Sequence, residues 1–93
     1  FEKADENVFK NLMLAKKSIK RGGNIPCILN AANEIAVDAF LKDQISFLNM
    51  SDLIENCMEK ITFVKNPTLE DYLSCDSETR ILAKKLLKHG NFN

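Results

Sequence analysis

The chain has 93 residues, 45% of them hydrophobic, and its 13 Lys plus Arg balance 13 Asp plus Glu. This length and apolar content suffice for one compact domain with a single core and exclude a second folded domain. A net charge of zero provides no long-range field for a nucleic acid or an anionic membrane, so we expect neither as a partner. The apolar stretches are far shorter than the roughly 20 residues that cross a bilayer. Because the chain begins at Phe1 without an initiator Met, we expect it to derive from a longer polypeptide.

The first expected helix covers residues 8–21. Its apolar residues recur at helical spacing and are expected to form its core face. They are Val8, Leu12, Ala15 and Ile19. Gly22 and Gly23 follow, and glycines in the left-handed conformation commonly end a helix.

A second helix is expected from Ile25 to Asp43, with Asn24 as its N-terminal cap and Pro26 in its first turn. Asparagine is among the preferred cap residues, and proline is tolerated in the first turn because a backbone N–H there has no acceptor within the helix. This helix is the least amphipathic of the chain.

The segment QISFLN, residues 44–49, is expected to be a short extended or turn segment whose apolar residues tuck under the bundle. Those apolar residues are Ile45, Phe47 and Leu48. A third helix over residues 52–63 would follow, capped by Asn49 or Ser51.

Two further helices are expected after the break at Asn66 and Pro67. Thr68 and Asp71 have the spacing of a capping box and would open a short helix through Leu73. Asp76 would then cap a last helix over residues 77–88, which Gly90 would end. The expected fold is therefore all-α, a small helical bundle of four main helices plus one short helix.

The three cysteines, Cys27, Cys57 and Cys75, are odd in number and widely spaced, which fits neither a disulfide framework nor a metal-binding CxxC motif. Each lies in or beside an apolar helical pattern, where a free cysteine behaves as a small buried hydrophobe. The lone His89, in the polar tail KHGNFN, has no second histidine to complete a metal site. A reduced, cytosolic environment is expected.

Residues for catalysis or for cofactor binding are not apparent. Only three glycines are present, too few for a phosphate-binding loop, and the GGN stretch is better explained as the end of one helix and the start of the next. A single histidine makes a cysteine–histidine nucleophile unattractive. Neighbouring acidic residues fit exposed helix faces or first helical turns better than an acid–base or metal site. We therefore expect no catalytic, cofactor-binding or metal-binding residue in this chain.

The stretch LNAANEIAVDAFL, residues 29–41, carries polar residues within an apolar helix. On a helical wheel they form one stripe, in which Val37 and Leu41 are embedded. The stripe consists of Asn30, Asn33, Glu34 and Asp38. We favour an internal hydrogen-bonded network, since buried polar groups must be satisfied, and the alternative is a contact with another domain or a ligand.

The same region carries a family resemblance. GGNIPCILNAANEIAVDAFLKDQISFLNM, residues 22–50, resembles the characteristic sequence of the C-terminal domain in the 1-deoxy-D-xylulose 5-phosphate reductoisomerase family. FEKADENVFKNLMLA at the start and LEDYLSCDSETRILAKKLL near the end are similar to the flanking patterns of that domain. Ala4 stands where the family commonly has Pro, and Thr79 where it often has Ala, both mild departures.

This resemblance implies a role within a larger enzyme. The family converts 1-deoxy-D-xylulose 5-phosphate to 2-C-methyl-D-erythritol 4-phosphate with NADPH and a divalent metal, Mg or Mn, in the non-mevalonate isoprenoid pathway. It implies a homodimer in the bacterial cytoplasm or a plastid, in which a helical domain supports the catalytic domain of the same polypeptide. NADPH and metal residues belong to other domains, so none is transferred to this chain. The alternative is an independent helical interaction module that binds a partner through Val37, Leu41 and Phe47.

Overall fold

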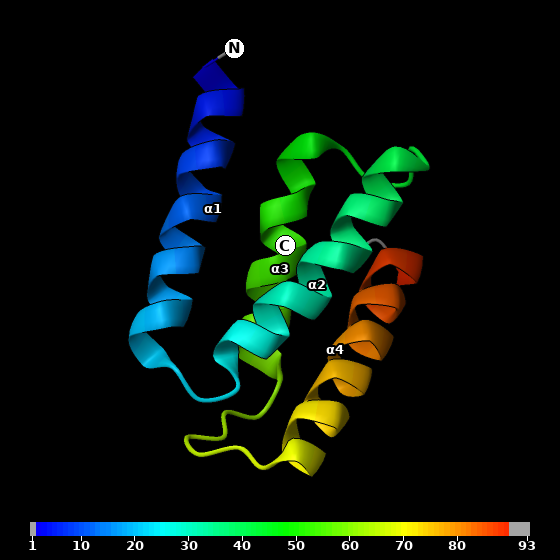
Figure 1. The fold of residues 1–93 in the computed structure, drawn as a ribbon. Helices are drawn as coiled ribbons and strands as arrows, with labels where there is room; N and C mark the ends of the chain where they lie inside the picture. Colours follow the sequence, from blue (N-terminus) through cyan, green and yellow to red (C-terminus); the bar gives the residue numbers. More distant parts are fainter. Residues whose placement is uncertain (1, 90–93) are drawn as a thin grey trace.

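The computed structural model describes the backbone of residues 2–89 and the side chains of residues 10, 12–47 and 49–88. Within this part the chain forms four helices and no strand (Figure 1). They are α1 (Glu2–Arg21), α2 (Ile25–Leu41), α3 (Phe47–Lys60) and α4 (Leu69–His89). The expected all-α bundle is confirmed.

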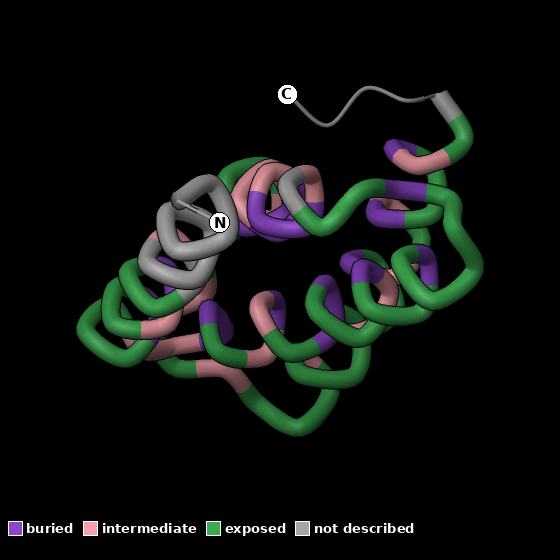
Figure 2. The backbone as a smooth tube through the Cα atoms, turned by 90° about the horizontal axis from the view of Figure 1, so that it is seen from above, coloured by how far each residue is buried: buried purple, intermediate pink, exposed green. Residues whose placement is uncertain are grey.

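Helix α2 is the centre of the arrangement, because it contacts each of the other three helices. Helix α1 packs against α2 and α3, α4 packs against the same two helices from the other side, and α1 and α4 do not touch. Figures 1 and 2 both show α1 and α4 at opposite edges of the bundle. One side of α1 is therefore left without a helical neighbour.

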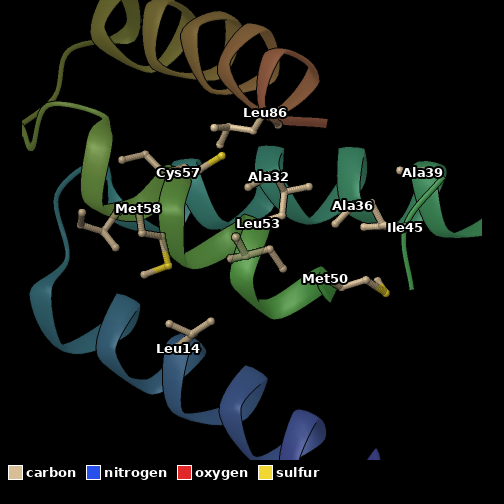
Figure 3. Packing of buried hydrophobic residues seen from close by; sticks show 14 of the residues in the cluster. Leu14, Ala32, Ala36, Ala39, Ile45, Met50, Leu53, Cys57, Met58 and Leu86 are labelled. Carbon is tan, nitrogen blue, oxygen red and sulfur yellow. The ribbon is translucent and has the colours of Figure 1, made fainter. Parts of the chain in front are cut away.

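The core forms where α2, α3 and α4 meet, and Figure 3 shows its packing. Helix α2 contributes four buried alanines, which allow α3 and α4 to approach closely, and two fully buried isoleucines, Ile25 and Ile28. Helix α3 contributes larger side chains, among them Leu53, Ile54 and Cys57, each at most 2% exposed. Burial of each large aliphatic side chain contributes about 1.5 to 3 kcal/mol.

Helix α1 enters this core through a different face from the one its sequence predicts. Leu14 and Ser18 are buried, whereas Leu12 is 51% and Ile19 78% exposed. The prediction of a core face through Leu12 and Ile19 is therefore wrong, since α1 has helices on one side only. The side chain of Val8, predicted for the same face, lies outside the described residues.

The turn between α1 and α2 is built as the glycine pair predicts. Gly22 and Gly23 have φ angles of 65° and 57°, which other residues adopt only with strain. A Cβ atom on Gly23 would lie 2.3 Å from the carbonyl oxygen of Val64, in the α3–α4 connection. Glycine is therefore required at this position by close contact as well as by backbone conformation.

Asn24 occupies the N-cap position of α2, but its side chain makes no capping hydrogen bond. Its Nδ2 donates to the Thr62 carbonyl (2.9 Å), and its Oδ1 accepts from the Val64 N–H (2.8 Å). The backbone N–H of Asn24 also donates to the Val64 carbonyl (3.0 Å). Asn24 is 1% exposed and fastens the α3–α4 connection to the start of α2.

Several helix boundaries differ from the sequence prediction. Helix α2 ends at Leu41, two residues early, because Asp43 has a φ of 59°. Helix α3 begins at Phe47 after Ser46, which has extended φ and ψ, so neither Asn49 nor Ser51 is its cap. Ile45 is buried as predicted, while Phe47 is 37% exposed. The side chain of Leu48 lies outside the described residues.

The two expected C-terminal helices are one continuous helix, α4. The capping box at its start is confirmed, with the Thr68 N–H donating to Asp71 Oδ2 (2.9 Å) and the Asp71 N–H to Thr68 Oγ1 (3.2 Å). The predicted cap at Asp76 is wrong, because Asp76 lies within the helix and accepts a hydrogen bond from Arg80 Nε (3.0 Å). Gly90, the predicted end, lies outside the described residues.

Candidate functional site

The polar stripe on α2 lies on the surface of the domain. Asn30, Asn33, Glu34 and Asp38 are all exposed. They do not form a buried network inside this domain, because the buried side of α2 is formed by its alanines with Ile25 and Ile28. The alternative interpretation, a contact with another domain, stays a prediction.

The two acidic members of the stripe have different partners: Glu34 reaches α4, and Asp38 reaches the C-terminal end of α2. Glu34 accepts a hydrogen bond from Arg80 Nη2, and Asp38 pairs with Lys42 at 3.0 Å. Arg80 also pairs with Asp76. Hydrogen bonds donated to Asp76 and then to Glu34 raise the pKa of Arg80 above its ordinary value. The Glu34–Arg80 pair bridges α2 to α4, while the other two pairs are local to one helix. All three lie at the surface, where ion pairs contribute little to stability.

The two asparagines face the opposite way, toward α1. Asn30 and Asn33 line an open hollow of about 420 Å³ between α1, α2 and α3. The remaining lining residues are Ala15, Pro26, Leu29 and Ile54. Apolar walls with two amide groups at the rim are suited to receive a protein segment that offers backbone hydrogen-bonding groups.

Two exposed apolar residues of α1 lie on the same helix face as Ala15, which lines this hollow. Leu12 and Ile19 share a helix face with Ala15, because they lie three residues before and four after it. We call the surface of Leu12, Ala15, Ile19, Asn30 and Asn33 the α1–α2 face. It combines apolar side chains on one helix with amides on the next, as protein interfaces commonly do.

A second apolar surface lies at the other end of α2. Val37 is 37%, Phe40 38% and Leu41 73% exposed, and they continue along α2 beyond Asn33. The ring of Phe40 meets that of Phe47 edge to face, with centroids 5.9 Å apart. We call these four residues the α2 end patch. It contains Val37, Leu41 and Phe47, the three residues predicted for an interaction module.

Possible ligands for a metal ion do not gather in the part of the chain that the structure describes. No three His, Cys, Asp or Glu side chains there converge as a metal site. A hollow of about 520 Å³ between α2 and α4 carries Asp38, Lys84 and Lys88, three exposed side chains of mixed charge. Nor is any helix in this part long and apolar enough to cross a membrane.

The sequence interpretation missed three features of this surface. The Asp76–Arg80 pair has a local signal, since residues four apart on a helix are neighbours. The Glu34–Arg80 pair has none, because only the packing of α2 on α4 brings these residues together. The exposure of Leu12 and Ile19 likewise depends on which side of α1 the other helices occupy.

Comparisons with known proteins agree with this description. Residues 1–82 match the family model of the DXP reductoisomerase C-terminal domain. The chain is 56% identical over 87 residues to the 1-deoxy-D-xylulose 5-phosphate reductoisomerase of Phocaeicola vulgatus, and 48% identical over 87 residues to that of Listeria monocytogenes. Each alignment covers 94% of this chain and 23% of the relative. The chain thus spans less than a quarter of the length of these curated relatives.

A solved structure shows the same architecture. The 1-deoxy-D-xylulose 5-phosphate reductoisomerase from Zymomonas mobilis in complex with NADPH matches with a TM-score of 0.76 and 44% sequence identity. The match covers 83% of this chain and 20% of that protein. From the family match over residues 1–82 and these relatives, we conclude that the chain belongs to the family of DXP reductoisomerase C-terminal domains.

Proposed function

We propose that this chain is the helical domain of a parent enzyme that rearranges and reduces 1-deoxy-D-xylulose 5-phosphate to 2-C-methyl-D-erythritol 4-phosphate. The relatives carry the reductoisomerase name, and the Zymomonas relative is described with NADPH. NADPH and a divalent metal, Mg or Mn, would bind the larger part of the parent that this chain does not span. The parent would act as a homodimer in the bacterial cytoplasm, and this chain alone would be inactive.

The role of the helical domain would be to support geometry. A rigid bundle that bears on the catalytic domain of the same polypeptide holds that domain in its working position relative to the cofactor. Because a misplacement of about 1 Å can cost about a hundredfold in rate, such support affects turnover without contributing a catalytic group.

The observation that carries this proposal is the α1–α2 face. Leu12 and Ile19 are more than half exposed although they belong to the main apolar face of α1. Contiguous exposed apolar surface commonly marks a contact with another protein surface. The amides of Asn30 and Asn33 at the adjacent hollow would satisfy backbone groups of the segment that covers it.

A matched pair of isoleucines tests this placement. Ile19 on α1 is 78% exposed and Ile81 on α4 is 65% exposed, and they lie on opposite sides of the bundle. In the parent enzyme we expect Ile19→Asp to lower kcat by about 10-fold to 100-fold, because a charge would face the catalytic domain. Ile81→Asp should leave kcat unchanged.

The isolated chain provides the second control. Both substitutions are at exposed sites, so each should change its free energy of unfolding by no more than about 0.5 kcal/mol. If Ile19→Asp and Ile81→Asp leave the parent equally active, the α1–α2 face is not the domain contact. If the unsubstituted parent does not convert 1-deoxy-D-xylulose 5-phosphate at all, the proposed activity itself is refuted.

The second candidate is an interaction module that uses the α2 end patch, favoured by the exposure of Val37, Leu41 and Phe47. Such a patch would bind the apolar face of a partner helix. Leu41→Asp in the parent distinguishes the two functions. A loss of turnover would show that the patch contacts the parent's own catalytic domain, whereas unchanged turnover would leave it free for a partner.

A further inference from the structure

Two cysteines meet where α2 crosses α4. Cys27 lies in the first turn of α2 and Cys75 in the second turn of α4, and both are free thiols. The Cys27 Sγ donates to the Tyr72 carbonyl at 3.6 Å, and the Cys75 Sγ donates to the Asn24 carbonyl at 3.9 Å. Tyr72 and Asn24 each precede the opposite cysteine by three residues. Each thiol therefore contacts the helical turn that carries the other.

The surroundings hold this pair in place. Asn24 Nδ2 donates to the Cys75 Sγ at 3.6 Å, and Asn24 is itself fixed by its hydrogen bonds to Thr62 and Val64. Cys75 is only 3% exposed, whereas Cys27 is partly exposed. A small reagent can therefore reach the Cys27 thiol first, with the Cys75 thiol behind it.

We propose that Cys27 and Cys75 form a disulfide bond between α2 and α4 when the folded chain meets a small disulfide oxidant such as oxidised glutathione. The Cys27 thiolate attacks one sulfur of the oxidant, which breaks the oxidant's S–S bond and releases one glutathione thiolate. The Cys75 thiolate then attacks the Cys27 sulfur, which forms the protein disulfide and releases the second glutathione. The two cysteines are oxidised, and one oxidised glutathione is reduced to two thiols.

The environment of Cys27 sets the rate. Burial first, and then the neighbouring Cys75 side chain, raise the pKa of Cys27 to about 11. Asp76 raises this pKa further, while Arg80 lowers it. Since the thiolate is the nucleophile, the reaction is slow at neutral pH and accelerates about tenfold per pH unit below the pKa.

Peptide mapping tests the proposal on the unsubstituted chain, since trypsin cleaves after Lys and Arg. The three cysteines fall in three separate tryptic peptides, residues 22–42, 43–60 and 66–80. The folded chain is incubated with oxidised glutathione, the remaining thiols are alkylated, and the digest is read by mass spectrometry. We expect one linked pair, 22–42 with 66–80, and alkylated Cys57 in the peptide 43–60.

Any linked pair that contains the peptide 43–60, or only glutathione adducts without a linked pair, would overturn the proposal. Cys57 is the matched control because it is fully buried on α3, and Cys57→Ser should retain the 22–42 to 66–80 link. Cys75→Ser should give only a glutathione adduct on Cys27. In guanidinium the chain should give mixed pairings, which shows that the specific link depends on the fold. The mapping of the unsubstituted chain decides the matter even if a variant fails to fold.

Discussion

The glycine pair between α1 and α2 allows a strict comparison of Gly23→Ala with Gly22→Ala. The two residues are adjacent and have similar positive φ angles, 57° and 65°. A Cβ atom on Gly22 would meet nothing within 4 Å, whereas one on Gly23 would lie 2.3 Å from the Val64 carbonyl oxygen and 2.9 Å from Phe63 Cε1. The two substitutions therefore share the backbone strain and differ in the steric clash.

The expected magnitudes follow from this geometry. An alanine with positive φ costs about 1 to 2 kcal/mol at either position. At Gly23 the Val64 carbonyl must also move away, which disrupts the hydrogen bonds that Asn24 and Val64 exchange, at 3.0 and 2.8 Å. Unmade hydrogen bonds of buried groups cost about 1 to 3 kcal/mol each. We expect a loss of about 1 to 2 kcal/mol for Gly22→Ala and about 3 to 5 kcal/mol for Gly23→Ala.

Urea denaturation of the 93-residue chain, followed by far-UV circular dichroism, measures both losses directly. Gly23→Ala should have a much lower transition midpoint than Gly22→Ala, with a similar slope against urea concentration. Equal losses for the two variants would refute the reasoning, because the close approach of Val64 to Gly23 would then have no energetic effect.

Three further predictions each test one feature of the core. Asn24→Ala should lower the free energy of unfolding by about 2 to 4 kcal/mol, because it leaves the Thr62 carbonyl and the Val64 N–H unpaired. Asn30→Ala, at an exposed helical site, should change it by less than about 0.7 kcal/mol. Equal effects of the two substitutions in urea denaturation would contradict this role of Asn24. The Thr79 hydroxyl is buried without a hydrogen-bond partner among the described residues, so Thr79→Val should raise the melting temperature by an amount that corresponds to about 1 kcal/mol. A lower melting temperature would show that the hydroxyl does make a hydrogen bond in the folded chain. Burial raises the pKa of Cys57 from 9.0 to about 11, so the thiolate is disfavoured in the folded state, and Cys57 should contribute a fall in stability of about 2 to 3 kcal/mol as pH rises from about 9 to 11, in addition to any fall from Cys27. Cys57→Ala should make this fall shallower, and an unchanged slope would show that Cys57 does not cause it.

The parts of the fold that are set by residues close together in the sequence were predictable. Gly22 and Gly23 marked the end of α1, and Thr68 with Asp71 marked the start of α4, because these signals act within a few residues. The cap predicted at Asp76 was wrong because that prediction, too, used only the local sequence. Asp76 is a good cap residue, but nothing before it breaks the helix, and Cys75 and Thr79 are buried on either side of it.

The candidate site was only partly predictable. The stripe with Asn30 and Asn33 was identified from helical spacing, yet spacing alone does not tell which side of α2 the other helices leave open. Apolar spacing on α1 likewise identified Leu12 and Ile19 as one face but assigned it to the wrong neighbour. Asn24 fastens the α3–α4 connection through Thr62 and Val64, which lie 38 and 40 residues away in the sequence, so no local pattern indicated this role.

The one-sided packing of α1 has a consequence for how the domain unfolds. Among its described side chains only Leu14 and Ser18 are buried, while the rest of the core belongs to α2, α3, α4 and the loop that contains Ile45. Lys10 of α1 pairs with Asp52 of α3 at 2.5 Å, but both side chains are about a third exposed, so this ion pair contributes little. The amide protons of α1 should therefore exchange with solvent through detachment of that helix alone. Those in the middle of α2 should exchange only when the whole domain unfolds, which makes α2, α3 and α4 the cooperative unit and α1 its separable part.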